Sequence, residues 1–160
     1  MNINIRPIQK EDNKIIASII RGALEDYGAN KPGTVYFDPT TDDMFKLFET
    51  ENSAYYIAEL EGEIVGGCGI FPTLNLPTGY VELVKIYMHR SARKKGIGSA
   101  LMEKCKEKAL ELGFTHLYLE SLPELNAAVT MYQKVGFKQL NAPLGESGHF
   151  ACNLWMELEL

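Results

Sequence analysis

The sequence has few cysteines and no long apolar run. Cys68, Cys105 and Cys152 are widely spaced and odd in number, which fits neither a disulfide framework nor a Cys-x-x-Cys zinc pattern. The longest apolar run, residues 64–71, is too short and too rich in glycine to span a bilayer. No apolar segment with a cleavage site follows the first residues, so no secretory signal is expected. These absences predict a cytoplasmic protein with reduced thiols, no metal and no membrane contact.

Positive charge is also in short supply. The chain has 16 Lys and Arg against 21 Asp and Glu, a net charge of -5. A nucleic-acid-binding protein would need basic residues to neutralise phosphates, so that class is disfavoured, whereas a cationic substrate suits the charge. With 160 residues, 46% of them hydrophobic, the chain can bury one core, and residues 1–160 are expected to form a single domain.

Apolar periodicity alternates between strand-like and helix-like stretches. Strands are predicted over residues 3–8, 54–60, 63–71, 80–88, 115–120, 137–140 and 150–158. Helices are predicted over residues 15–27, 41–48, 97–112 and 126–135, with Asp12 and Thr41 as caps of the first two and Gly113 as the stop of the third. This order predicts an α/β or α+β domain, with helices flanking a mixed sheet that has one crossover near the middle.

The stretch Arg93-Lys94-Lys95-Gly96-Ile97-Gly98 follows a predicted strand and opens an amphipathic helix. Free N–H groups at a helix start attract phosphate, and glycine lets the backbone approach it closely. A pyrophosphate would fit there, although a plain strand-to-helix turn with solvated basic residues fits the same letters. The Lys-Ser/Thr of a triphosphate loop is missing after the second glycine, which disfavours a nucleotide-binding enzyme.

In this context the RxxGxG pattern after Glu-Leu-Val-Lys-Ile-Tyr-Met resembles motif A of the GNAT superfamily of N-acetyltransferases. A second stretch, from Asn126 through Tyr132 to Gly136-Phe137, is similar to that superfamily's motif B. The resemblance is strong over residues 81–138 and elsewhere extends only to element order. It implies a GNAT-like fold: a mostly antiparallel sheet of six to seven strands, about four helices and a splayed parallel strand pair. It also implies acetyl-CoA as acyl donor and transfer to an amine.

The resemblance further implies where acetyl-CoA lies. The pyrophosphate would meet the glycine loop, backbone groups of the preceding strand would hold the pantetheine arm and thioester carbonyl, and Asn126 would touch the arm from the other side. The residues expected to bind the cofactor are Ile86, Tyr87, Met88, Arg93, Lys94, Lys95, Gly96, Ile97, Gly98, Ser99 and Asn126.

Glu82 and Tyr132 are the candidate catalytic residues. Alternation places Glu82 on the strand face of Val84, Ile86 and Met88, where partial burial would raise the pKa of its carboxyl toward that of a useful base. A surface position or a salt bridge is an equal alternative for Glu82. Tyr132 has the spacing of an ordinary core tyrosine, and only the resemblance makes it a donor to the leaving sulfur.

The acceptor is the least predictable part of the site. Tyr36 and Phe37 lie in a loop that could line it, and His149 follows a polar, glycine-containing loop, but packing explains all three side chains as well. Cys105 fits a buried structural thiol. A small-molecule or peptide amine is expected as substrate, and both monomer and homodimer remain open. The competing function is a non-catalytic acyl-CoA-binding sensor.

Overall fold

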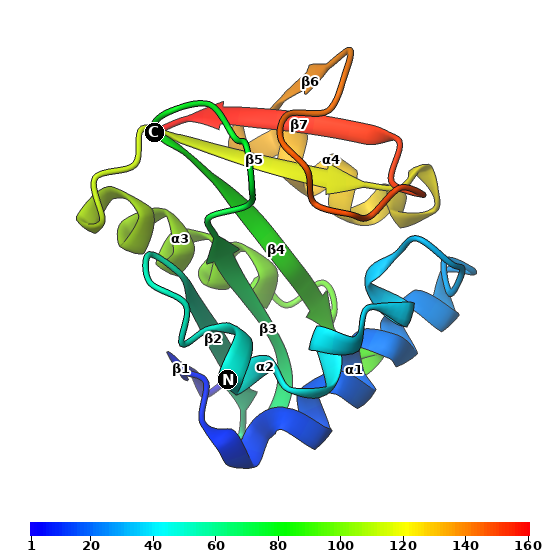
Figure 1. Cartoon of the computed structure of the whole chain (residues 1–160). Helices are drawn as coiled ribbons and strands as arrows, with labels where there is room; N and C mark the ends of the chain where they lie inside the picture. The colour runs from blue at the N-terminus through cyan, green and yellow to red at the C-terminus, as the bar shows by residue number, and fades with distance from the viewer.

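A computed structural model describes all residues, 1–160. Its centre is a seven-stranded sheet with the order β1-β2-β3-β4-β5-β7-β6. The strands are β1 (Ile3–Pro7), β2 (Ala54–Leu60), β3 (Glu63–Phe71), β4 (Tyr80–Met88), β5 (His116–Ser121), β6 (Lys138–Leu140) and β7 (Leu154–Glu159). All neighbours are antiparallel except β4 and β5, which are parallel. The predicted mixed, mostly antiparallel sheet with one parallel pair is confirmed (Figure 1).

Four α-helices cover the sheet, as predicted: α1 (Asn13–Asp26), α2 (Met44–Leu47), α3 (Ile97–Glu111) and α4 (Asn126–Val135). Short 3-10 helices add η1 (Lys10–Asp12), η2 (Val35–Phe37), η3 (Pro39–Asp42), η4 (Arg90–Ala92) and η5 (Pro123–Leu125). None of the helices is both long enough and apolar enough to cross a membrane.

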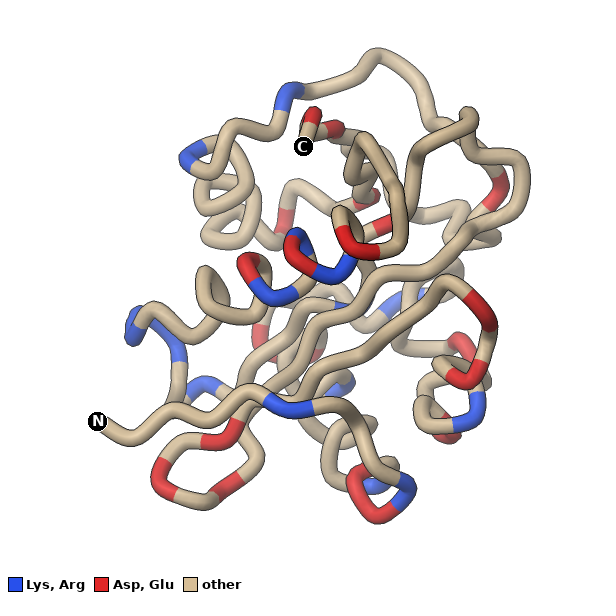
Figure 2. The backbone as a smooth tube through the Cα atoms, turned by 90° about the vertical axis from the view of Figure 1, so that its left-hand side faces the viewer, with Lys and Arg blue, Asp and Glu red and all other residues tan.

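The two faces of the sheet carry separate apolar clusters. One contains the buried side of α3 together with Leu83, Leu119 and Tyr132, and the other packs α1 against β2 around Tyr55. The outer side of α3, which faces the viewer in Figure 2, carries Lys and Glu interspersed. Such alternation of a buried stripe and a charged face is what fixes α3 against the sheet.

β4 and β5 separate after a short common stretch. Only three residue pairs join them, the last being Glu82 with Tyr118, although both strands continue beyond it. In Figure 1 the two strands start together beside the C-terminus and then diverge. The gap opens where Lys85 has a φ of 52° and the β3–β4 register shifts between Gly67 and Gly69. A β-bulge of this kind bends the strand and increases its twist.

Glycines in β3 make room for the side chain that holds the bulge. A Cβ on Gly67 would lie 2.5 Å from the ring of Tyr55, and one on Gly69 would lie 2.6 Å from it. With no side chains there, the Tyr55 ring crosses β3, and its hydroxyl donates to the carbonyl of Lys85 at 2.7 Å. The Gly-Gly-Cys-Gly stretch is therefore a condition for the opening between β4 and β5.

The bulge corrects one prediction. Past Lys85 the alternation is shifted by one residue, so Ile86 and Met88 pack with Leu83 in the α3 cluster, while Tyr87 packs in the α1 cluster. Glu82, next to Leu83 and before the bulge, therefore lies on the opposite face from Ile86 and Met88. A strict period of two along the strand was the wrong assumption.

Of the two predicted helix caps, Asp12 is confirmed in position and Thr41 is wrong. Asp12 is the N-cap residue of α1, but its side chain makes no cap bond; it pairs with Arg6 at 2.8 Å and accepts from Gln9 N. Thr41 lies inside η3, and its hydroxyl donates to the carbonyl of Val35. The cap of α2 is Asp43, whose side chain accepts from Lys46 N.

Candidate active site

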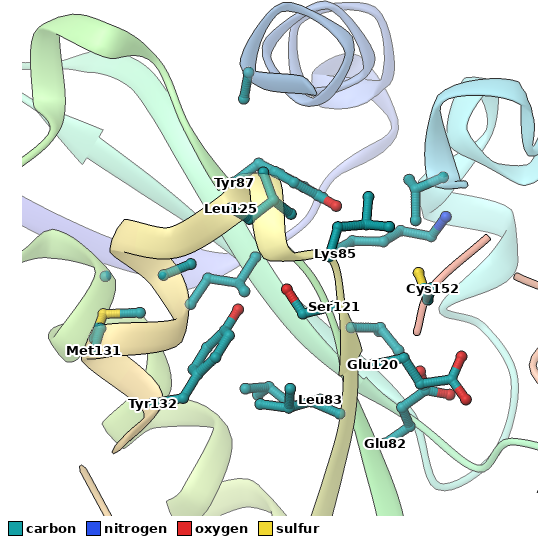
Figure 3. Close-up of a pocket in the computed structure, with 18 of the residues that line it drawn as sticks. Glu82, Leu83, Lys85, Tyr87, Glu120, Ser121, Leu125, Met131, Tyr132 and Cys152 are labelled. Atoms are coloured by element: carbon teal, nitrogen blue, oxygen red, sulfur yellow. The ribbon is translucent and has the colours of Figure 1, made fainter. Parts of the chain in front are cut away.

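The opening between β4 and β5 continues into a cavity of about 790 Å³. Its walls come from β4, β5, α4, the first turn of α3, the loop before η3 and the loop before β7. The glycine loop, Tyr132 and several ionisable groups all line it. Figure 3 shows Tyr132 on one side of the cavity and Glu82 and Glu120 on the other. One cavity thus contains both a helix N-terminus suited to binding phosphate and a group of ionisable side chains.

At the glycine loop, α3 begins directly after Gly96, which has a left-handed φ of 78°. Lys94 is also left-handed, with a φ of 61°. Ile97, Gly98 and Ser99 form the first turn and line the cavity. Their N–H groups have no intrahelical acceptors, because a helix cannot pair its first donors. This is the geometry that binds a phosphate.

Arg93 is held in place by its neighbours. Its guanidinium donates to the carbonyl of Met88 at 3.1 and 3.3 Å, pairs with Asp26 at 3.1 Å and lies over the Tyr27 ring, 4.9 Å from the centroid. These contacts link α1 to the end of β4. Arg93 therefore shapes the loop as well as contributing positive charge there.

The backbone of β4 presents free groups to the gap. His89 N donates to Val65 on β3, so alternation points the N–H and C=O groups of Met88 and Ile86 the other way, toward β5. The Met88 carbonyl is taken by Arg93. The N–H groups at these two positions are therefore the donors available to a molecule lying between the strands.

Tyr132 reaches the cavity from α4. The residue is 5% exposed and packs edge-on against Phe137, with ring centroids 5.7 Å apart. No protein group bonds its hydroxyl, which points into the space beside Ser121 in Figure 3. Burial raises the pKa of Tyr132 well above its usual value. The hydroxyl is thus a protonated hydrogen-bond donor over the whole working pH range.

Glu82 is a buried carboxyl in the wall of the cavity. It is 4% exposed, and Thr73 donates to its Oε1 at 2.5 Å. Burial raises its pKa to about 7, with the neighbouring charge of Glu120 adding to the rise and the Thr73 bond opposing it. No bond reaches Oε2, and that oxygen is not sealed from the cavity. Glu82 can therefore take up a proton near neutral pH.

Behind Glu82, three ionisable side chains form a cluster. Lys85 is 7% exposed, and its Nζ lies 3.7 Å from Asp38 Oδ2 and 3.3 Å from Thr41 Oγ1. His149 Nε2 is 2.9 Å from the same Asp38 oxygen. The His149 hydrogen bond holds the pKa of Asp38 well below its usual range, while burial lowers the pKa of Lys85. The cluster joins the loop before η3 to the loop before β7.

The loop before β7 is also tied to β5. Ser147 donates to Glu120 Oε1, Tyr118 donates to Glu120 Oε2 at 2.6 Å, and Leu144 N donates to the Tyr118 hydroxyl at 3.0 Å. These bonds hold the segment beside β5, and Glu146, Ser147 and His149 of the same segment line the cavity.

The structure does not bring every predicted residue to the cavity wall. The expected cofactor residues Ile86, Tyr87, Met88, Arg93, Lys94, Gly96, Ile97, Gly98 and Ser99 all line it, as do Glu82, Tyr132 and His149. Lys95, Asn126, Tyr36 and Phe37 do not line it. Phe37 is 58% exposed and packs edge-on with Tyr36, while their neighbours Val35 and Asp38 reach the cavity instead.

The polar residues of the wall that sequence reasoning missed include Asp38, Thr73, Lys85, Glu120 and Ser121. Lys85 left a usable signal, because a lysine inside the apolar strand Leu-Val-Lys-Ile needs a buried partner. Asp38 looked like an ordinary turn residue before Pro39, and its partner His149 is far away in sequence. Cys152 also lines the cavity, but burial raises the pKa of its thiol to about 12, which keeps it protonated and unreactive.

Comparisons with known proteins agree with this architecture. YjgM, an uncharacterized N-acetyltransferase of Escherichia coli (strain K12), is 36% identical over 98% of this chain and 94% of its own length. A GNAT acetyltransferase from Staphylococcus aureus Mu50 has a TM-score of 0.83 at 17% identity, covering 99% of both chains. The PaiA N-acetyltransferase of Thermoplasma acidophilum, solved in complex with coenzyme A, has a TM-score of 0.79 at 16% identity over both full chains.

Fold and relatives together define an enzyme of the acyltransferase class. The chain belongs to the acetyltransferase (GNAT) family, which matches residues 14–137. This confirms the resemblance seen in the sequence around the glycine loop and Tyr132.

Proposed function

We propose that this chain, acting as a single N-acetyltransferase domain, moves an acetyl group from acetyl-CoA to a small-molecule or peptide amine by direct attack on the thioester. The observation that carries the proposal is Glu82: a buried carboxyl with a pKa of about 7 and an unpaired oxygen, in one cavity with a helix N-terminus and a buried tyrosine hydroxyl. These are the groups that such a transfer needs.

The glycine loop would hold the pyrophosphate of CoA. The first turn of α3 offers N–H donors, and Arg93 and Lys94 add positive charge beside them. The PaiA relative was solved with coenzyme A and shares the fold, which supports a CoA ligand here. The free N–H groups of Ile86 and Met88 would bind the arm and the thioester carbonyl, polarising it for attack.

Glu82 would act as the general base. An alkylamine with a pKa near 10 must lose its proton before it attacks, which costs roughly 4 kcal/mol at pH 7. A carboxylate whose pKa is about 7 accepts that proton far better than an exposed glutamate would. The carboxyl takes the proton directly or through one ordered water molecule.

Tyr132 would support the leaving sulfur. A tyrosine of pKa about 10 is a weaker acid than a thiol of about 8.5, and burial weakens Tyr132 further. Full proton transfer to the thiolate is therefore uphill. Tyr132 would stabilise the developing negative charge on sulfur by a hydrogen bond and keep its own proton.

The acceptor would bind between Glu82 and the Asp38–His149 pair. Carboxyl groups of Glu82, Glu120 and Glu146 line this end, whereas Lys85 and His149 are both directed at Asp38. The net negative charge attracts a protonated amine before it loses its proton.

A screen of amines that follows CoA release tests the proposal. Turnover with at least one amine is expected, together with a rise in the melting temperature, Tm, when CoA is added. CoA binding without release of free thiol from acetyl-CoA in the presence of any amine would point to the acyl-CoA-binding sensor. Absence of CoA binding would reject both functions.

A further inference from the structure

Ser121 carries the one side-chain polar atom of the chain that is fully buried and has no hydrogen-bond partner. The residue is 4% exposed and lines the cavity. Leaving a buried hydroxyl unpaired destabilises a folded protein, so native structures rarely keep one without a reason. At a cavity wall, that reason is a partner that arrives with a ligand.

The position of Ser121 narrows down that ligand. It is the last residue of β5 and pairs with Leu154 of β7 on one edge, while its other edge faces the gap left by β4. Alternation puts its side chain on the face of Leu119, in whose apolar cluster Tyr132 lies. In Figure 3 the hydroxyls of Ser121 and Tyr132 point into the same part of the cavity.

The position of Ser121 along β5 indicates that its partner is the thioester group of the cofactor. Pairing of the parallel strands ends at Glu82 and Tyr118. Parallel strands advance together, so Ser121, three residues past Tyr118, lies across the gap from Lys85 and Ile86. The proposed function places the thioester end of the CoA arm at Ile86 and Met88.

We propose that Ser121 Oγ donates a hydrogen bond to the thioester sulfur and keeps it as the thiolate leaves, alongside Tyr132. The inference rests on the proposed function. In the step, the amine that Glu82 has already deprotonated bonds through its nitrogen to the carbonyl carbon, and the C–S bond breaks with its electron pair on sulfur. The second nitrogen proton leaves to solvent. Ser121 and Tyr132 keep their protons, and the thiolate is protonated by solvent after release. Two donors suit a buried site where neither hydroxyl is acidic enough to transfer its proton.

The test compares Ser121→Ala, Ser121→Thr, which keeps the hydroxyl, and Ser18→Ala as a matched control on the exposed side of α1. In Ser121→Ala, kcat is expected to fall about tenfold, the worth of one hydrogen bond, with the KM for the amine unchanged. The Tm of the ligand-free variant is expected to equal or exceed that of wild type, because an unpaired hydroxyl is removed. Ser121→Thr should recover most of kcat, and Ser18→Ala should match wild type throughout.

Thr41→Val is the control for the effect of Ser121→Ala on stability. It removes a buried hydroxyl that does have an acceptor, the Val35 carbonyl, so its Tm should fall. A Ser121→Ala protein with wild-type kcat and a similarly lowered Tm would show a structural hydroxyl, satisfied by a bound water, and would overturn the proposal.

Calorimetry with acetyl-CoA and with desulfo-CoA, which lacks the sulfur, distinguishes a contact to the sulfur from a contact to the rest of the pantetheine arm. Ser121→Ala should weaken binding of acetyl-CoA and leave desulfo-CoA unaffected. Equal weakening of both would assign the hydroxyl to the arm and overturn the sulfur contact. If wild type turns over no amine, the proposed function fails, yet this pair of affinities still decides for or against Ser121.

Discussion

Replacing Glu82 by Gln removes the ability of the side chain to take up a proton while keeping its packing. The amide has nearly the same shape, and its carbonyl can still accept from Thr73, which donates to Oε1 at 2.5 Å in wild type. What is lost is the ability to take a proton. If Glu82 is the general base, kcat/KM should fall about 10²-fold or more, the usual worth of such catalysis. CoA affinity, measured by calorimetry, should stay unchanged.

The pH profile gives the sharper result. In wild type, kcat/KM should rise with pH through about 7 as Glu82 loses its proton. The Gln enzyme should lack that step and recover activity only at higher pH, where free amine supplies itself. A Gln enzyme with the wild-type profile would remove Glu82 from the mechanism and leave His149 or an ordered water as the base.

The same group makes a stability prediction with a definite sign. The folded state holds the Glu82 proton more tightly than the unfolded state, because burial raises the pKa from 4.5 to about 7. Its favourable contribution is therefore present below the unfolded pKa and is lost as pH rises through the folded one. Over that window wild type should lose about 3 kcal/mol of unfolding free energy relative to Glu82→Gln. Urea denaturation of both proteins at pH 4.5 and 8 measures this difference, and parallel pH dependence would refute the buried, proton-binding carboxyl.

Three other substitutions test the rest of the site. Tyr132→Phe should lower kcat about tenfold or more at every pH, with partial rescue by a thioester of a more acidic thiol; full activity would leave Tyr132 a packing role only. Gly98→Trp should abolish the CoA-induced rise in Tm with an unchanged circular dichroism spectrum, because a Cβ there would already lie 3.0 Å from the Met88 side chain and 3.1 Å from that of Met131, so the indole would fill cavity space beside the glycine loop; wild-type CoA affinity would show that CoA does not bind at this loop. Tyr55→Phe leaves the Lys85 carbonyl without its donor and should cost about 1–3 kcal/mol in urea unfolding together with some kcat; wild-type stability would mean that this bond does not hold the bulge.

The glycine loop and its surroundings were predictable from sequence because they are local. Gly96 and Gly98 stand where a strand ends and a helix begins, and both the turn and the free N–H groups follow from a few consecutive residues. The helix stop at Gly113, which has a φ of 89°, is equally local. Amphipathic spacing placed α3 and α4 within a residue or so of their observed bounds.

The acceptor end was not predictable, because its contacts join distant parts of the chain. Asp38 and His149 are 111 residues apart, and the residues next to each of them give no sequence signal that the two form a pair. The bulge at Lys85 likewise depends on Tyr55, a residue of another strand that needs the glycines of a third. One extra residue in β4 moved Ile86 and Met88 to the face opposite Glu82, which no alternating pattern could reveal.

Three features of the cavity wall lower the stability of the fold. Lys85 has a left-handed φ, Glu82 is a buried carboxyl, and Ser121 holds an unpaired buried hydroxyl. Each one conflicts with the rules that otherwise describe this chain, and all three lie along the cavity wall. Departures of this kind are expected where function requires them. Their presence together on one wall supports, without reference to any relative, the proposal that the acetyl group is transferred between β4 and β5.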